Sequence, residues 1–97
     1  MPGYLIANIE VHDAAKYEEY RRKVTGVIAQ YGGRYLVRGG ALDVREGVLP
    51  LSRVVVLEFP TLDAARRFYD SSEYAPLKAL RLAGARSDVV LVDGYAT

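Results

Sequence analysis

Two glycine pairs, Gly32-Gly33 and Gly39-Gly40, bracket a short segment and constrain the fold more than any other feature of the sequence. Glycine adopts backbone conformations that are closed to other residues, so such pairs commonly mark the ends of helices and strands. Before the first pair, apolar residues recur every three or four positions, which predicts an amphipathic helix. Between the pairs, residues 35–38 predict a strand. The chain is therefore expected to pass from a helix into a sheet at the first pair, and to kink or bulge at the second.

The order of the predicted elements is that of a small α+β fold. Asp13 and Thr61 are suitable N-caps for two helices, and Pro76 fits the first turn of a further helix that Gly84 ends. The order β-α-β-β-α-β is the ferredoxin-like split βαβ pattern. We expect the helices on one face of a sheet whose first and third strands lie in the centre, parallel to each other. Strands are predicted over residues 4–11, 35–38 (with a possible continuation through 41–45), 52–59 and 88–93, and a hairpin loop over residues 46–50.

Composition excludes several classes of protein. The chain of 97 residues fits one domain, residues 1–97, and 51% hydrophobic against 26% charged residues is typical of a packed globular protein. A net charge of +1 is too balanced to favour nucleic-acid binding. The absence of cysteine and the single histidine exclude disulfides, iron–sulfur clusters and cysteine or multi-histidine metal sites within the chain. We expect no metal, no cofactor and no membrane segment, and a cytoplasmic protein.

Two predicted strands are apolar on both faces, which favours a homodimer. Residues 54–57 and 89–92 are continuous runs of valine and leucine rather than an apolar–polar alternation. Because helices on one side cover only one face of the sheet, the other face would expose several hundred Å² of apolar surface. A second copy packing sheet against sheet would bury it across a symmetric interface. We therefore expect the ferredoxin-like sandwich to pair through its open sheet face as a dimeric α+β barrel.

Three motifs carry a resemblance to a known family. They are Gly32-Gly33-Arg34-Tyr35-Leu36-Val37-Arg38-Gly39-Gly40, Val55-Val56-Leu57-Glu58-Phe59-Pro60 and Phe68-Tyr69-Asp70-Ser71-Ser72-Glu73-Tyr74. With Asp13, Tyr17, Tyr20 and Arg81, the chain resembles domain-of-unknown-function family 1330 nearly from end to end. The resemblance implies the dimeric α+β barrel superfamily, which includes cofactor-free monooxygenases, haem-dependent enzymes, small isomerases and lyases, and ligand-sensing domains. The family has no settled activity, so the resemblance implies a fold and a dimer but no reaction.

The expected topology gathers candidate binding residues at one edge of the sheet. If the hairpin turns around residues 47–49, Arg38 lies opposite residue 59 and beside Glu58. Parallel central strands would bring His12 to the same edge, near helix N-termini, where anionic ligands often bind. Aromatic side chains from the helices could wall this space. The predicted substrate-binding residues are Arg38, Glu58, His12, Tyr20, Tyr69, Tyr74 and Arg81.

Each candidate also has a purely structural interpretation. Arg38 can bind a ligand carboxylate as a bidentate fork, or form a cross-strand ion pair with Glu58 that sets the register. His12 can be a general acid or base, or an exposed loop residue. The tyrosines can line a pocket or belong to the core or the dimer interface. Arg81 can pair with Glu73 or Asp70, or reach into the pocket.

Three functional hypotheses follow from these residues. The first is a cofactor-independent enzyme acting on a small anionic or aromatic compound, with Arg38 orienting the anion and Glu58 or His12 moving a proton. The second is a non-catalytic ligand-binding or stress-linked domain that uses the same pocket. The third is a structural dimer in which Arg38 and Glu58 form only an ion pair. Haem is not expected, because the single histidine is predicted at a sheet edge.

Overall fold

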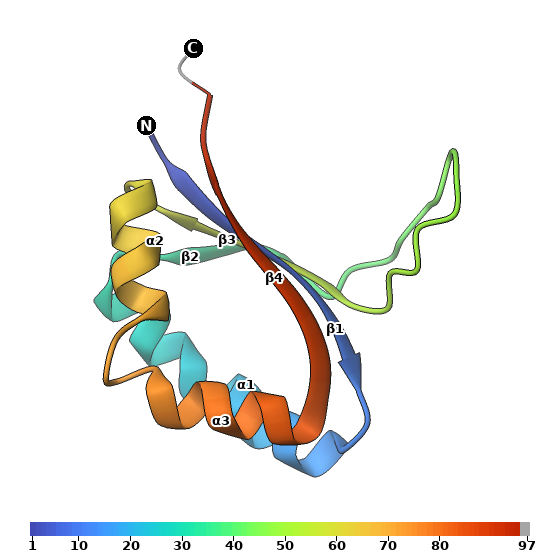
Figure 1. Cartoon of the computed structure of the whole chain (residues 1–97), viewed down its shortest axis with the longest axis horizontal. Coiled ribbons are helices and arrows are strands. Elements are labelled where there is room, and N and C mark those ends of the chain that lie inside the picture. Colours follow the sequence, from blue (N-terminus) through green and yellow to red (C-terminus); the bar gives the residue numbers. More distant parts are fainter. Residues whose placement is uncertain (96–97) are drawn as a thin grey trace.

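The computed structural model describes residues 1–95, so the last two residues of the predicted domain, Ala96 and Thr97, lie outside the described residues. Three helices cover one face of a single twisted four-stranded sheet (Figure 1), which is the predicted α+β, ferredoxin-like arrangement. Among the described residues, no helix is both long and apolar enough to cross a membrane. The elements are β1 (Gly3–Val11), α1 (Ala14–Gln30), β2 (Arg34–Arg38), β3 (Val54–Phe59), α2 (Leu62–Tyr69), α3 (Ala75–Gly84) and β4 (Ala85–Asp93).

The helices begin where the predicted caps stand. The Asp13 side chain accepts a hydrogen bond from the Lys16 backbone N–H at 3.2 Å, and Thr61 Oγ1 accepts one from Ala64 at 3.0 Å. Each bond satisfies an N–H group that has no partner within its own helix. Helix α1 ends before Gly32, whose φ of +78° is a left-handed conformation that favours glycine. The polar caps of α1 and α2 and the glycine after α1 therefore act as the sequence predicts, whereas α3 begins without a side-chain cap.

The two central strands are antiparallel, and the prediction that they run parallel is wrong. The sheet order is β2-β3-β1-β4, and every neighbouring pair is antiparallel. Helix α1 returns the chain so that β2 runs parallel to β1 one position away, and β3 then fills the gap in the opposite direction. Gly3 at the start of β1 pairs with Phe59 at the end of β3. The carboxyl ends of the two central strands therefore lie at opposite ends of the sheet.

The connection between β2 and β3 is a long irregular loop rather than a hairpin. Residues 39–53 form no strand, so the predicted continuation through residues 41–45 is wrong, and β3 begins at Val54. The loop projects away from the sheet (Figure 1). Its length shifts the register from the one expected for a turn at residues 47–49. Arg34 pairs with Glu58 and Arg38 with Val55, so the predicted placement of Arg38 beside Glu58 is also wrong.

A β-bulge in β2 decides which way Arg38 points. The pairing register shifts between Tyr35 and Val37, which leaves Leu36 as an extra residue. Tyr35 lies opposite the buried Leu57, on the helix-covered face, and regular alternation would send Arg38 to the other face. The extra residue reverses the alternation, so Arg38 pairs with the buried Val55 instead. The bulge therefore puts Tyr35 and Arg38 together on the helix-covered side of the sheet.

The two faces of the sheet differ sharply in what covers them. The core lies between the sheet and the helices, with Val24, Phe59 and Phe68 among its most deeply buried side chains. The other face is uncovered in the single chain, where Ile6 is 38% exposed and Val90 54% exposed. In the described part of the chain, Arg81 is the one charged residue that is buried with the core.

Candidate functional site

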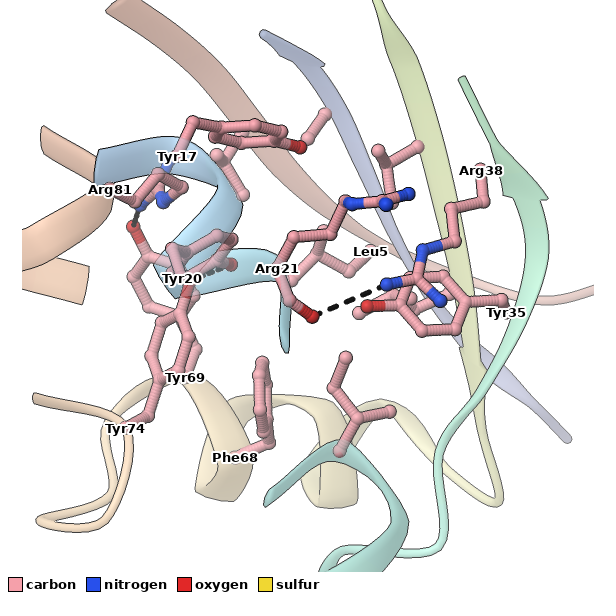
Figure 2. Close-up of a pocket in the computed structure, with 15 residues that line it drawn as sticks. Leu5, Tyr17, Tyr20, Arg21, Tyr35, Arg38, Phe68, Tyr69, Tyr74 and Arg81 are labelled. Carbon is pink, nitrogen blue, oxygen red and sulfur yellow. Dashed lines mark hydrogen bonds between the residues drawn. The ribbon is translucent and has the colours of Figure 1, made fainter. Parts of the chain in front are cut away.

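A cavity opens between the helix-covered face of the sheet and the helix layer (Figure 2). Its enclosed part has a volume of about 30 Å³, which is room for one or two water molecules. Small-molecule sites usually enclose several hundred Å³, so a ligand would enter only if the side chains at the open mouth moved. Apolar core residues from β1, β3 and α1 form much of its wall. Its polar lining includes Tyr20, Tyr35, Arg38, Tyr69, Tyr74 and Arg81.

Arg38 stands at the mouth of the cavity. Its side chain is exposed, and its guanidinium carbon lies 4.3 Å from the centre of the Tyr35 ring, a cation–π contact. One Nη atom donates a hydrogen bond of 3.3 Å to the Arg21 backbone carbonyl, as Figure 2 shows. No carboxylate of the described chain forms an ion pair with Arg38, whereas Arg21 pairs with Glu18 at 3.1 Å. Most of the donors of Arg38 therefore remain available to a ligand.

Arg81 occupies the inner end of the cavity as a buried charge that has no counter-ion among the described residues. Its residue is only 2% exposed, and no carboxylate in residues 1–95 lies within ion-pair distance. One Nη atom donates a long hydrogen bond of 3.4 Å to the Tyr69 hydroxyl, and Nε has no partner. A buried unpaired guanidinium costs several kcal/mol, as an order of magnitude. This side chain is therefore poorly satisfied by the protein alone.

The predicted alternative, that Arg81 pairs with Glu73 or Asp70, is not what the structure has. Glu73 accepts hydrogen bonds from Tyr31 at 3.0 Å and from Gln30 at 3.4 Å instead. These bonds, with its own backbone N–H as the largest contribution, lower the pKa of the Glu73 carboxyl. Arg81 instead lines the cavity.

Three tyrosine hydroxyls surround this inner end. The hydroxyls of Tyr20 and Tyr74 are 2.9 Å apart, and the Tyr69 hydroxyl accepts from Arg81. Burial, the largest effect, raises the pKa of Tyr20, and it also raises the pKa of Tyr74 against the opposing charge of Arg81. Both phenols therefore stay neutral at physiological pH and can donate hydrogen bonds.

Two of the predicted binding residues lie elsewhere. Glu58 is on the uncovered face of the sheet, where its carboxylate pairs with Arg34 Nη2 at 2.8 Å, so the predicted Arg38–Glu58 ion pair is wrong. His12 is exposed beyond the end of β1, and its backbone N–H donates to the Gly84 carbonyl. Neither residue lines the cavity. The structure brings together the other five, Tyr20, Arg38, Tyr69, Tyr74 and Arg81, and their binding of a ligand stays a prediction.

The sequence interpretation missed Tyr35 and Tyr17 as cavity residues. Tyr17 precedes Tyr20 by three positions, which is the spacing of neighbours on one helix face, so a signal was present. Tyr35 and Arg38 share a face only because of the bulge, for which the sequence carries no comparable signal.

The lining residues suit binding and orientation better than acid–base chemistry. The cavity is lined by tyrosine, arginine and apolar side chains, and no aspartate, glutamate, histidine, serine or cysteine of the described chain takes part. Such a lining offers hydrogen-bond donors and positive charge but no base that titrates near neutral pH. Within residues 1–95, no group of three or more His, Cys, Asp or Glu side chains could hold a metal ion.

Solved structures that resemble this chain share its ferredoxin-like fold. A protein of unknown function from Rhodopseudomonas palustris matches with a TM-score of 0.75 at 16% identity, covering 99% of this chain and 84% of that one. SnoaB, a cofactor-independent oxygenase from Streptomyces nogalater, matches with a TM-score of 0.66 at 19% identity, over 99% and 95% of the chains. A dimeric ferredoxin-like protein of unknown function from Thermobifida fusca matches with a TM-score of 0.65 at 17% identity, over 96% and 91%. Identities this low show the common fold alone.

The chain belongs to the family described as a domain of unknown function, DUF1330, whose model matches residues 2–95. The resemblance stated from the sequence motifs is therefore confirmed. No curated protein matches the sequence.

The buried tyrosine pair predicts a loss of stability at alkaline pH. Because the pKa values of Tyr20 and Tyr74 are raised in the folded state, the unfolded chain releases their protons first, above the ordinary value of 10.0. Stability is therefore intact below that pH and falls above it, by up to about 1.4 kcal/mol per pH unit for each phenol. Urea unfolding at a series of pH values should show this fall for the parent protein and a shallower one for the Tyr20→Phe/Tyr74→Phe double variant.

Tyr95→Phe is the matched control, because Tyr95 is 87% exposed. It should follow the parent curve. Equal alkaline losses in the parent and the double variant would contradict the assignment.

Proposed function

We propose that this domain binds a small molecule with an anionic group attached to an aromatic or apolar body, in the cavity between Arg38 and Arg81. The observation that carries the proposal is the burial of Arg81 beside three phenols, with no carboxylate of residues 1–95 in the cavity lining. Burial of a charge is strongly unfavourable until an opposite charge arrives, so the inner end of the cavity is prepared for an anion. The aromatic and apolar wall provides contact area for the rest of the molecule.

Entry of such a molecule requires the mouth to open. The enclosed space of about 30 Å³ is smaller than an aromatic ring, so side chains at the mouth must move. Arg38 is suited to this because its side chain is exposed and two weak contacts hold it, a hydrogen bond of 3.3 Å to the Arg21 carbonyl and the cation–π contact with Tyr35. Its swing would widen the mouth and keep a cation next to the incoming anion.

Binding is favoured over catalysis by the same geometry. The enzymatic hypothesis used Glu58 or His12 to move a proton, and both lie away from the cavity. SnoaB is a cofactor-independent oxygenase, and its likeness to this chain is one of fold. A reaction in this cavity would therefore have to use the reactivity of the ligand itself. The hypothesis of a purely structural dimer required an ion pair between Arg38 and Glu58, and these residues are not paired in the sheet.

Replacement of Arg81 by methionine should stabilise the empty domain and weaken ligand binding. Methionine removes the unpaired charge while filling much of the same space, so the free energy of unfolding should rise by about 1 kcal/mol or more. Affinity for benzoate, measured by calorimetric titration, should fall at least tenfold, as expected for the loss of a charge-assisted hydrogen bond, worth roughly 1.5–3 kcal/mol.

Arg66→Met is the matched control, because Arg66 is an exposed arginine on α2. It should change neither benzoate affinity nor stability appreciably. A strongly destabilised Arg81→Met protein, or one that binds benzoate as well as the parent, would show that Arg81 serves the fold and not a ligand.

We also propose that two copies pair through the uncovered sheet face. Ile6, Val37, Val90 and Val92 are between 38% and 54% exposed there. They belong to β1, β2 and β4, and the half-buried Val56 of β3 pairs with both Ile6 and Val37, which makes the apolar surface continuous. Monomeric proteins seldom leave such a surface in water, and a second copy would bury it. The Thermobifida fusca neighbour with this fold is dimeric, which supports the proposal. A cytoplasmic location and the absence of nucleic-acid binding stay predictions.

A lysine on this face should separate the copies. Light scattering should give the parent protein a mass near twice 10.7 kDa, and Val90→Lys a lower average mass at micromolar concentration. Leu82→Lys is the control, because Leu82 is 59% exposed on α3, in the helix layer away from this face. A parent protein that stays at 10.7 kDa would contradict the proposal.

A further inference from the structure

We infer that the ligand is two-ended: a hydroxy-substituted aromatic acid whose carboxylate meets Arg38 at the mouth and whose phenol oxygen meets Arg81 at the inner end. The inference rests on the proposed function and deepens it. Figure 2 shows the two arginines on opposite sides of the cavity, with aromatic side chains between them. Neither has a carboxylate partner in the described chain, so one ligand with two oxygen-bearing ends would satisfy both.

The inner end suits a single oxygen atom that carries negative charge. Arg81 offers an unpartnered Nε–H and a weakly engaged Nη, which donates to Tyr69 at 3.4 Å. In the pair formed by Tyr20 and Tyr74, one hydroxyl donates to the other, which leaves one hydroxyl proton available. Several donors thus gather in a buried space that holds no anionic acceptor of the described chain. Such a group stabilises an oxyanion more strongly than water does.

The mouth suits a carboxylate. The guanidinium of Arg38 is planar, exposed and supported on one side by the Tyr35 ring at 4.3 Å. A planar fork of N–H donors matches the two oxygens of a carboxylate, which can stay partly hydrated there. Leu57 and Phe68 give the cavity apolar wall, against which an aromatic ring would pack once the mouth has opened.

This arrangement has a chemical consequence for the bound phenol. Burial acts against ionisation here, as it does for Tyr20 and Tyr74. A ligand oxygen, however, would accept directly from the Arg81 Nε–H, which donates to no group of the described chain. A close opposite charge of this kind favours the phenolate by about one to three pKa units. The phenol O–H bond breaks, the electron pair stays on oxygen, and the proton leaves to bulk water. The cavity would therefore ionise a bound phenol at a pH where the free phenol is still largely neutral.

The test uses an ortho-nitrophenol that carries a carboxylate para to its hydroxyl, because the phenolate form absorbs visible light. Absorbance is recorded across pH with the probe free and then saturated with the intact protein. The pKa of the bound phenol should be at least about one unit lower, which corresponds to tenfold tighter binding of the phenolate than of the phenol. Benzoate affinity is measured alongside as the readout of the proposed function. Benzoate has no phenol oxygen to occupy the inner end, so its carboxylate is expected to bind Arg81 there.

Variants of Arg81 and Arg38 test the inner end and the mouth of the cavity separately. Arg81→Met should abolish the shift of the probe pKa. Arg81→Lys keeps the positive charge and should retain part of the shift, which shows whether the loss in Arg81→Met comes from the charge or from misfolding. Arg38→Met should weaken probe binding about tenfold and keep the shift, in line with the loss of one charged hydrogen bond. Arg66→Met should behave as the parent.

Two results would overturn the inference. If benzoate binds but the probe pKa is unchanged, or is shifted equally in Arg81→Met, the two-ended ligand is wrong and the proposed function stands. If neither benzoate nor the probe binds, the proposed function fails and the inference fails with it.

Discussion

A chain of aromatic contacts holds the helix layer on the sheet and shapes the space beneath it. Phe68 of α2 lies 5.2 Å from Phe59 of β3 and 4.5 Å from Tyr74, measured between ring centres. Tyr74 in turn contacts Tyr20 of α1 at 6.4 Å. Each pair contributes about 0.5–1.5 kcal/mol beyond the area it buries. The aromatic residues thus fix the helices at a distance that leaves a cavity, and Tyr20, Phe68 and Tyr74 also form part of its wall.

Arg81 is the exception within this layer, and the functional account follows from it. Every other charged residue in the described chain keeps some access to water, and several form exposed ion pairs such as Lys23 with Glu19 at 3.2 Å. A buried arginine with one long hydrogen bond weakens the empty domain. Residues that reduce stability at a cavity are expected where function requires them. An anionic ligand would supply the missing counter-ion and so remove this loss of stability.

The sequence predicted the helical part of the site well and the strand part poorly. Tyr20 and Tyr69 follow from helical spacing and from the caps at Asp13 and Thr61, because these signals are local. Tyr74 and Arg81 follow from the spacing in the next helix, α3, which has proline in its first turn and no side-chain cap. Arg38 does line the cavity, but it was predicted at a binding site for reasons that the structure contradicts. The central strands are antiparallel, and Arg38 pairs with Val55 and not with the end of β3. Register and bulge position depend on contacts across the sheet and on the course of residues 39–53, which no local pattern encodes.

The central claim, that Arg81 binds the anionic group of a ligand, can be tested by NMR of its guanidinium group. The Nε–H of Arg81 is buried and has no hydrogen-bond partner in the empty domain, so its signal should be protected from exchange yet lie where non-bonded groups resonate. Titration with benzoate should move this signal saturably toward the position of a hydrogen-bonded group. A signal that is already in that position without ligand, or that stays unchanged at saturating benzoate, would contradict the account.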